Sequence, residues 1–290
     1  MKIIVTGSSG LIGNSIINSL SKDDYSILAL FHSVEPVINV HKNIELLKLD
    51  LTCGNLNPLS DFKPDCLIHC AAKIPSNLST EEFTLTAKIN RKIDEAVIGF
   101  CRDYNIKLIY FSSISVYENN IPPYRESDFV LPSNDYSIEK LNTELKIADN
   151  INDYIIFRVS SPYGEFQKNR NVLKLFVEKA KCHQEIQLYS GGRRQQDFIH
   201  VEDISAAISK AIHLKNINSV FNLAFGKTIS MRNLAQIIIA SYKSNSKIVY
   251  KELEDINPNY NPVIDISKAK AILHWQPSVF LDMGLRDFLN

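Results

Sequence analysis

Short apolar runs alternate with amphipathic stretches along residues 2–160 of the chain. The runs carry Ile, Leu, Val and Phe at successive positions, which is typical of strands buried on both faces. Between them, apolar residues recur every three or four positions, a spacing that predicts helices. The predicted strands are residues 2–7, 26–31, 44–51, 66–72, 107–113 and 153–160, and the predicted helices are 11–22, 84–104 and 137–150. This alternation predicts an α/β fold, a doubly wound parallel sheet covered by helices on both faces.

Beyond Pro162 the alternation is less regular. One further strand is predicted at 219–224, and helices are predicted at 171–183, 201–214, 231–244 and 266–275. These segments predict a smaller C-terminal lobe, interleaved with chain that returns to the sheet. We therefore assign residues 1–165, with a returning segment at about 196–226, to the main domain, and residues 166–195 plus 227–290 to the lobe.

The composition is that of a globular protein, with 45% hydrophobic and 22% charged residues in a chain of 290. Lys and Arg number 32 and Asp and Glu number 32, so the net charge is zero. A neutral chain has no field that attracts a nucleic-acid backbone or an anionic membrane, and we expect neither as a partner. Because the chain begins without a signal segment and no apolar stretch approaches the ~20 residues of a bilayer span, we expect a cytoplasmic protein.

The five cysteines are odd in number and lie mostly in apolar surroundings: Cys53, Cys66, Cys70, Cys101 and Cys182. This pattern indicates reduced thiols that pack like small hydrophobic side chains. Cys66 and Cys70 lie on a predicted buried strand, and no second Cys/His cluster has the spacing of metal ligands. We therefore expect no metal.

The first predicted strand leads into the sequence TGSSGLIG. Gly7 suits a tight turn, Gly10 lets the backbone approach a bound group, and Gly13 lets the following helix pack closely. Such a turn is also compatible with an ordinary loop. Its place between the first strand and the first helix instead favours a dinucleotide, whose pyrophosphate would meet the backbone N–H groups of Leu11, Ile12 and Gly13. The main domain is therefore expected to bind the cofactor and the lobe the substrate.

Two later strand ends extend the predicted cofactor site. Asp50 lies where ligands of open α/β sheets collect, and its carboxylate could accept the adenine amino group. Ala71 and Ala72 are small enough for a cofactor to cross the strand ends, and we assign the neighbouring Leu51 and Lys73 to the same edge. The alternative is that Asp50 is a turn residue and that the alanines serve packing.

Tyr136 and Lys140 are four residues apart on a predicted helix, so they share one face. A phenol has a pKa near ~10, but a lysine ammonium and a positive nicotinamide both favour the phenolate and would lower the pKa of Tyr136. Ser113, at the end of an earlier strand, could hydrogen-bond the same substrate oxygen. Taken alone, the Tyr136 and Lys140 pair is also compatible with an ordinary helix surface.

Six segments resemble, in order and spacing, the extended short-chain dehydrogenases/reductases, the family of nucleotide-sugar epimerases, dehydratases and ketoreductases. They are TGSSGLIG, HCAA, FSSISVY, YSIEK, RVSSPYG and QDFIHVEDI, and the closing DISKAKAILHWQP is similar to the family's usual ending. The resemblance implies a Rossmann domain and a nucleotide-sugar substrate. It also implies that Ser113, Tyr136 and Lys140 are the catalytic triad and that Lys140 holds the nicotinamide ribose. Asn90 matches an asparagine that supports a proton relay, although a helix cap or kink is the other interpretation of it.

Departures from the family pattern reduce the number of reactions that the resemblance allows. Dehydratases of the family carry an acidic residue after the catalytic serine or threonine, where this chain has Ile114 and Ser115. The resemblance therefore speaks against dehydration. Two chemistries remain, a 4-ketoreductase that consumes NADPH and a 4-epimerase that keeps NAD bound. We favour the reductase; a non-catalytic dinucleotide-binding regulator is a third reading, although such relatives typically lose the tyrosine or lysine that this chain keeps.

The diphosphate contacts also depart from the pattern. Ser161 and Gln196 stand where many members have an asparagine and an arginine for the sugar diphosphate. Arg193 and Arg194 could replace that charge, or they could form a solvated turn. Asn171 stands where relatives often contact the nucleotide-sugar.

The residues after the predicted strand 26–31 indicate whether NAD or NADP is bound. NAD-specific proteins usually place an acid there for the ribose hydroxyls, whereas NADP needs donors for a phosphate. His32 and Ser33 are donors and Glu35 comes late, so NADP is preferred, with NAD as the alternative.

Members of the family commonly dimerise through two long helices, which correspond here to residues 84–104 and 137–149. Both carry apolar residues beyond those needed against one sheet, including Ile93, Val97 and Leu145. We therefore expect a homodimer with C₂ symmetry.

Overall fold

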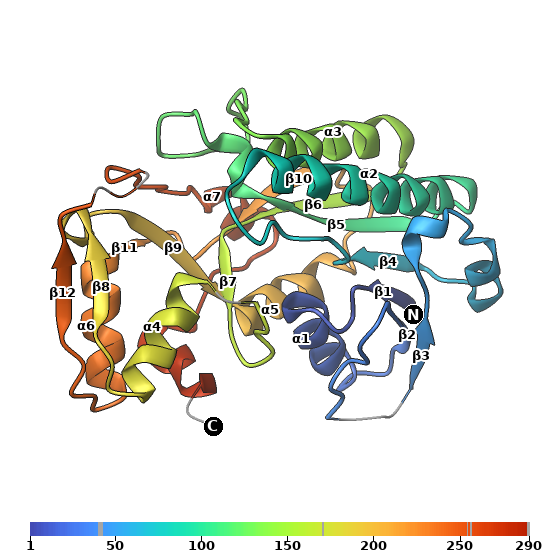
Figure 1. The fold of residues 1–290 in the computed structure, drawn as a ribbon. Helices are drawn as coiled ribbons and strands as arrows, with labels where there is room; N and C mark the ends of the chain where they lie inside the picture. The colour runs from blue at the N-terminus through green and yellow to red at the C-terminus, as the bar shows by residue number, and fades with distance from the viewer. Residues whose placement is uncertain (40–42, 170, 254, 256, 289–290) are drawn as a thin grey trace.

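The computed structural model describes residues 1–39, 43–169, 171–253, 255 and 257–288. Its centre is one seven-stranded sheet (Figure 1). The strands are β1 (Lys2–Thr6), β2 (Ser26–Phe31), β3 (Ile44–Lys48), β4 (Cys66–His69), β5 (Lys107–Ser113), β6 (Tyr154–Val159) and β10 (Ser219–Leu223), in the order β10-β6-β5-β4-β1-β2-β3. Every neighbouring pair is parallel, so the predicted doubly wound sheet is confirmed. The order reverses between β1 and β4, and ligands of such sheets bind at the carboxyl ends of the strands beside that reversal.

Helices cover both faces of this sheet (Figure 1). On one face lie α1 (Leu11–Leu20), α5 (Val201–Ala211) and α7 (Ser267–Ile272), and on the other lie α2 (Thr80–Asp103) and α3 (Asp135–Asn150). Short 3₁₀ helices follow two of the strands: η1 (Leu51–Cys53) and η2 (Asn57–Phe62) come after β3, and η3 (Ile114–Tyr117) comes after β5. The predicted helix at 84–104 begins earlier, at Thr80, because the Ser79 side chain accepts a hydrogen bond from the Glu82 N–H and caps the first turn.

The first strand shows why the apolar runs become central strands. Ile3, Ile4 and Val5 are all fully buried. Ile3 and Val5 pack in the same cluster as Ile16 of α1, whereas Ile4 packs in the cluster on the opposite face. Successive side chains therefore enter two different cores, so every position must be apolar.

The C-terminal lobe has its own core, built from α4 (Val172–Lys181), β8 (Ile186–Tyr189), α6 (Met231–Ser241) and the end of the chain. β8 pairs with β12 (Ile248–Lys251) in a two-stranded parallel sheet. A three-stranded sheet of β11 (Thr228–Ser230), β9 (Gln195–His200) and β7 (Ser161–Tyr163) lies between the lobe and the main sheet (Figure 1). Two further short segments close the chain, α8 (Leu281–Gly284) and η5 (Leu285–Phe288).

One part of the predicted lobe packs elsewhere. Ala269, Leu273 and Trp275 lie in the core of the main sheet, and the Trp275 indole N–H donates to the Asp203 carbonyl at 2.9 Å. The segment around α7 therefore belongs with the main domain and not with the lobe assigned to 227–290. The apolar spacing of this helix predicts burial but carries no information about which core receives it.

The cysteines are free thiols wherever the structure describes them. Cys66 and Cys101 are buried, Cys53 and Cys182 are exposed, and burial raises the pKa of the Cys66 thiol to about 12.

The described residues include no group of three or more His, Cys, Asp or Glu that could hold a metal ion. Within the same ranges, no helix has the length and apolar character needed to cross a membrane.

Candidate active site

The glycine turn lies at the carboxyl end of β1, beside the end of β4. Gly7 has φ +62°, and a Cβ there would lie 2.6 Å from the Ala71 nitrogen. A Cβ at Gly13 would collide with the Gly7 carbonyl oxygen. A Cβ at Gly10 would meet only that carbonyl, at 3.2 Å. Gly7 and Gly13 are therefore needed for packing between turn, helix and sheet, while Gly10 is exposed and a Cβ there would be tight against one backbone oxygen alone.

Helix α1 begins at this turn without a side-chain cap, and no acidic residue lies in its first turn. The N–H groups of Leu11, Ile12 and Gly13 are among the first amides of the helix, which have no partner within it, and the helix dipole adds a partial positive charge there. This donor set, next to the open side of Gly10, fits a pyrophosphate.

The next strand ends line the same edge of the sheet. Ala71 N–H donates to the Thr6 hydroxyl at 3.1 Å, which holds the end of β4 against β1. The backbone of Lys73 donates to Asn90 Oδ1 at 2.7 Å and accepts from Asn90 Nδ2 at 2.9 Å. The Asn90 side chain therefore anchors the loop after β4 and does not act as a helix cap. Ala72 lies half-buried in this loop.

Asp50 and His32 meet at the ends of β3 and β2. The Asp50 Oδ1 atom accepts from the Thr52 N–H at 2.9 Å and from the Thr52 hydroxyl at 2.7 Å, so the carboxylate caps η1, whose first residue is the buried Leu51. Its Oδ2 atom lies 3.8 Å from His32 Nε2. His32 and Ser33 are both exposed. One carboxylate oxygen therefore serves the turn, as the alternative interpretation held, and the other faces the end of β2.

The predicted catalytic residues come from β5 and α3. Ser113 ends β5, and its hydroxyl accepts from the Ser115 N–H at 3.1 Å. A capping box between Asn134 and Ser137 fixes the start of α3, where Tyr136 is the second residue. One turn later, Lys140 Nζ donates to the Phe111 carbonyl at 3.1 Å, two residues before Ser113. This bond holds α3 against the end of β5.

Burial dominates the electrostatics of this pair. It raises the pKa of the Tyr136 phenol, and the Asp94 carboxylate adds to the rise. Burial also lowers the pKa of the Lys140 ammonium, while Asp94 opposes that change. The protein's own groups thus act against the lowering of the Tyr136 pKa that we expected from lysine and nicotinamide together, because Lys140 is directed at Tyr110 and Phe111. In the protein alone, burial and Asp94 therefore both favour the protonated phenol.

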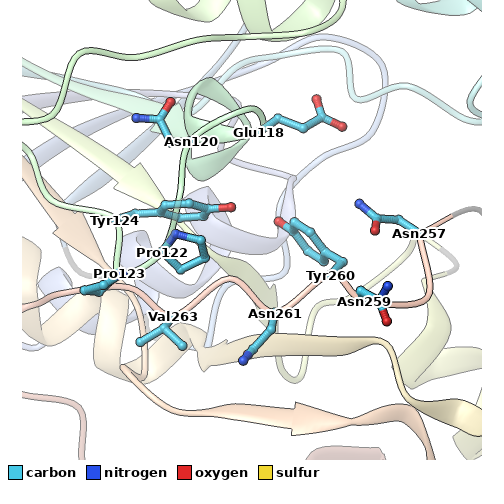
Figure 2. A pocket seen from close by; sticks show the side chains of 10 residues that line it. All are labelled: Glu118, Asn120, Pro122, Pro123, Tyr124, Asn257, Asn259, Tyr260, Asn261 and Val263. Atoms are coloured by element: carbon cyan, nitrogen blue, oxygen red, sulfur yellow. The ribbon is translucent and has the colours of Figure 1, made fainter.

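A cavity of about 490 Å³ opens beside the start of α3 (Figure 2). Its wall is formed by Glu118, Asn120, Pro122, Pro123, Tyr124, Asn257, Asn259, Tyr260, Asn261 and Val263. Glu118 Oε2 accepts from Asn134 Nδ2 at 3.0 Å, so the cavity wall is bonded to the cap of the helix that carries Tyr136. Figure 2 shows the rings of Tyr124 and Tyr260 pointing toward one another across the cavity. Amide, carboxylate and phenol groups of this kind suit the hydroxyl groups of a sugar.

The residues expected near a diphosphate are spread over several positions. Gln196 Nε2 donates to the Ser161 hydroxyl, so these two replacements bond to each other. Arg193 is exposed, whereas Arg194 Nε lies 3.2 Å from the Asp255 carboxylate, without the alignment of a hydrogen bond. Asn171 caps α4, and its Oδ1 accepts from the Lys174 N–H at 3.0 Å. Arg194 is thus already paired, and Arg193 is the arginine whose charge faces solvent.

Three residues at the site escaped the sequence analysis: His69, Asp94 and Tyr110. Asp94 is a buried carboxylate in the middle of α2, on the face that packs on the sheet. An acidic residue four positions after Asn90, among residues with helical apolar spacing, was the available signal.

The comparison with known proteins identifies the family of the chain. The model of the NAD dependent epimerase/dehydratase family matches residues 3–224, and the chain belongs to this family. It is 28% identical to a putative UDP-glucose 4-epimerase of Methanocaldococcus jannaschii, over 99% of this chain and 97% of the relative. It is 31% identical to dTDP-4-dehydro-6-deoxyglucose reductase of Escherichia coli, over 62% of this chain and 59% of the relative.

A solved structure shares the fold. The UDP-glucose 4-epimerase of Thermotoga maritima, crystallised with UDP-glucose, superposes with a TM-score of 0.88 over 99% of this chain and 96% of that one, at 24% identity. The likeness in fold covers the C-terminal lobe as well as the main sheet.

Proposed function

We propose that the protein reduces the 4-keto group of a nucleotide-linked sugar with NADPH. The observation that carries the proposal is the arrangement of Ser113, Tyr136 and Lys140 at the junction of β5 and α3, where Lys140 Nζ is bonded to the Phe111 carbonyl two residues before Ser113. Burial and Asp94 also favour the protonated phenol. A reduction needs this protonated form, because the oxygen of the carbonyl must gain a proton as its carbon gains a hydride.

The chain's own groups would act as follows. NADPH, which the glycine turn and Lys140 would hold, would supply the hydride that the carbonyl carbon gains. The Ser113 hydroxyl donates a hydrogen bond to the carbonyl oxygen and orients it, and Tyr136 Oη transfers its proton to that oxygen, giving the sugar hydroxyl. Lys140, charged, stabilises the phenolate that remains until it takes a proton from solvent. Ser115 Oγ, buried without a hydrogen-bond partner among the described residues, is a further donor close to Ser113.

A 4-epimerase is the second candidate, because the relative in Methanocaldococcus jannaschii that matches over nearly the whole chain is described as one. An epimerase must first oxidise the sugar, so Tyr136 would have to act as phenolate. Burial and Asp94 raise the pKa of the Tyr136 phenol, so the positive nicotinamide would have to lower that pKa again.

The experiment that separates the candidates follows nicotinamide absorbance. The purified protein, mixed with NADPH and a panel of nucleotide-linked 4-keto-sugars, is expected to consume one NADPH for each sugar reduced. Protein that purifies with tightly bound NAD, and that interconverts two sugars without a net absorbance change, is the epimerase.

Cofactor preference is expected to depend on the end of β2. Ser33→Asp places a carboxylate where the 2′-phosphate of NADPH would lie, so NADPH affinity should fall and preference should turn to NADH. Titration of both cofactors by nicotinamide fluorescence measures this. Ser26→Asp adds the same charge at the other, exposed end of β2, about 20 Å away, and should leave the ratio unchanged. If the Ser33→Asp protein keeps the wild-type ratio of NADPH affinity to NADH affinity, the end of β2 does not set the cofactor preference.

The dimer is also a proposal, and the structure changes which residues could form it. Val97 is fully buried in the core and is not available to a partner, while Leu145 on α3 is 57% exposed, and Leu85 and Ile138 are also exposed. We expect a dimer at micromolar concentration by light scattering and a monomer for Leu145→Glu. Leu253→Glu, a substitution at another exposed leucine, should remain dimeric. A monomeric wild-type protein would contradict the proposal.

A further inference from the structure

A continuous chain of hydrogen bonds runs from Lys140 into the protein interior. Lys140 Nζ donates to Tyr110 Oη at 2.9 Å, and Tyr110 Oη donates to Asp94 Oδ2 at 3.0 Å. Asp94 Oδ1 lies 3.0 Å from His69 Nε2, and His69 Nδ1 lies 2.6 Å from Thr6 Oγ1. The chain crosses α3, β5, α2, β4 and β1, and it ends on the strand that leads into the glycine turn.

The donors and acceptors of this chain match with a neutral His69. Ala71 N–H donates to Thr6 Oγ1, which can then donate its proton to His69 Nδ1. The Nε2–H of His69 donates to Asp94, whose other oxygen also accepts from the Thr143 hydroxyl at 2.8 Å. Every polar group in the chain has a partner, as a buried polar network requires.

Asp94 is the distinctive charge in this network. The titratable groups around Lys140 and its partners are Asp94 on α2, Tyr136, Glu139 and Glu144 on α3, Tyr110 on β5, His69 on β4 and Cys70 after it. Glu144 is paired with Arg158 at 2.6 Å, and Glu139 is bonded by Arg91 Nε at 3.0 Å. Within the described residues, the basic groups that act on Asp94 are Lys140, through Tyr110, and His69, which adds a positive charge only when it is protonated. A buried carboxylate without a cation is costly, so Asp94 and Lys140 stabilise each other's charge.

Resting on the proposed function, we propose that Asp94, acting through Tyr110, is a positioning residue that keeps Lys140 charged and holds its ammonium group against Tyr110 and the end of β5, one helical turn from Tyr136. Tyr110 fixes the direction, because its hydroxyl and the Phe111 carbonyl are two acceptors for one ammonium. Asp94 supplies the opposing charge. Through His69 and Thr6, the same network joins Lys140 to the strand ends that hold the cofactor.

Asp94→Asn tests this role. Asparagine keeps the shape and can still accept from Tyr110 and Thr143, while His69 can change tautomer to accept from the amide. Without the carboxylate, the charged form of Lys140 and the neutral form of Tyr136 both become less favourable, so the alkaline limb of the kcat/KM profile should move to lower pH. Loss of orientation should lower kcat roughly 10- to 100-fold.

The control is Glu95→Gln, which removes the adjacent charge of the same helix, where Glu95 is half-exposed and bonded to Lys146 at 2.6 Å. It should leave the profile in place. Tyr110→Phe is the second variant: it keeps the ring, removes the link between Lys140 and Asp94, and should reproduce the lower kcat.

A readout without turnover separates this inference from the proposed function. Because Lys140 is expected to hold the nicotinamide ribose, NADPH affinity should weaken at lower pH in Asp94→Asn than in the wild-type protein, whichever sugar is the substrate. An Asp94→Asn protein with wild-type pH dependence of NADPH affinity and of kcat/KM would overturn the inference. So would a Glu95→Gln protein that shifts equally.

Discussion

Tyr136→Phe is expected to lower turnover by roughly 10²–10⁴-fold, the contribution of a positioned acid, while NADPH binds as before. The substitution removes the proton that Tyr136 would give to the sugar oxygen but keeps the ring that fills its half-buried position at the start of α3. Steady-state kinetics and a cofactor titration on the same preparation measure the two effects. Tyr104→Phe, on an exposed tyrosine at the end of α2, should keep full activity.

Lys140→Met should behave differently from the tyrosine variant. Lys140 is expected to serve both the phenol and the ribose, so turnover and cofactor affinity should fall together. Full turnover in Tyr136→Phe would assign the acid role to another residue and refute the triad.

Gly10→Val is expected to abolish NAD(P)H binding while the fold remains intact. A Cβ at this position would lie 3.2 Å from the Gly7 carbonyl oxygen and near no other atom, so the turn would have to move by only a few tenths of an ångström to admit the side chain. The branched methyl groups would occupy the space in front of the first amides of α1, where the pyrophosphate must come close. Titration calorimetry measures binding, and circular dichroism checks the fold.

The control for this variant is Gly99→Val, since a Cβ at Gly99 on α2 meets nothing within 4 Å. It should bind the cofactor normally. Gly7 and Gly13 are unsuitable, because a side chain at either position would collide with backbone of the turn or of β4. Unchanged affinity in Gly10→Val would show that the turn is only a loop.

The sequence was sufficient for the central strands of the main sheet because they are buried on both faces, whereas β3 at the edge is mostly exposed. Ile3, Ile4 and Val5 enter cores on both sides of the sheet, so every position of this run must be apolar. Such a continuous apolar run can be recognised from the sequence alone. The short strands β8 and β12 were missed, since β8 has only two buried positions in four residues and β12 has none. Trp275 shows a further limit, because an amphipathic helix does not specify which core it enters.

The site shows the same division. The glycines and the Tyr136 and Lys140 pair are local patterns, because a turn and one helical repeat fix their geometry. The network behind Lys140 is not local: Asp94 meets His69, 25 residues away, and Tyr110, 16 residues away, only when α2 lies on β4 and β5. The bond between Ser161 and Gln196 also depends on the pairing of β7 with β9.

The residues expected to contact a substrate diphosphate are those that depart most clearly from the family pattern. Gln196 and Ser161 are neutral and bonded to each other, and Arg194 is paired with Asp255. A nucleotide-linked substrate would therefore be bound by Arg193 alone or would have to displace Asp255 from Arg194. In either case we expect a lower affinity for the substrate than two preformed arginines would give.

The most direct test of hydride transfer at this site uses NADPH that carries deuterium at the transferable position of the nicotinamide. Incubated with a nucleotide-linked 4-keto-sugar, the wild-type protein is expected to give a product with deuterium on the carbon that bore the carbonyl, as seen by mass spectrometry, and Tyr136→Phe almost none. A product formed without deuterium, or labelled equally by both proteins, would contradict a reduction carried out by Ser113, Tyr136 and Lys140.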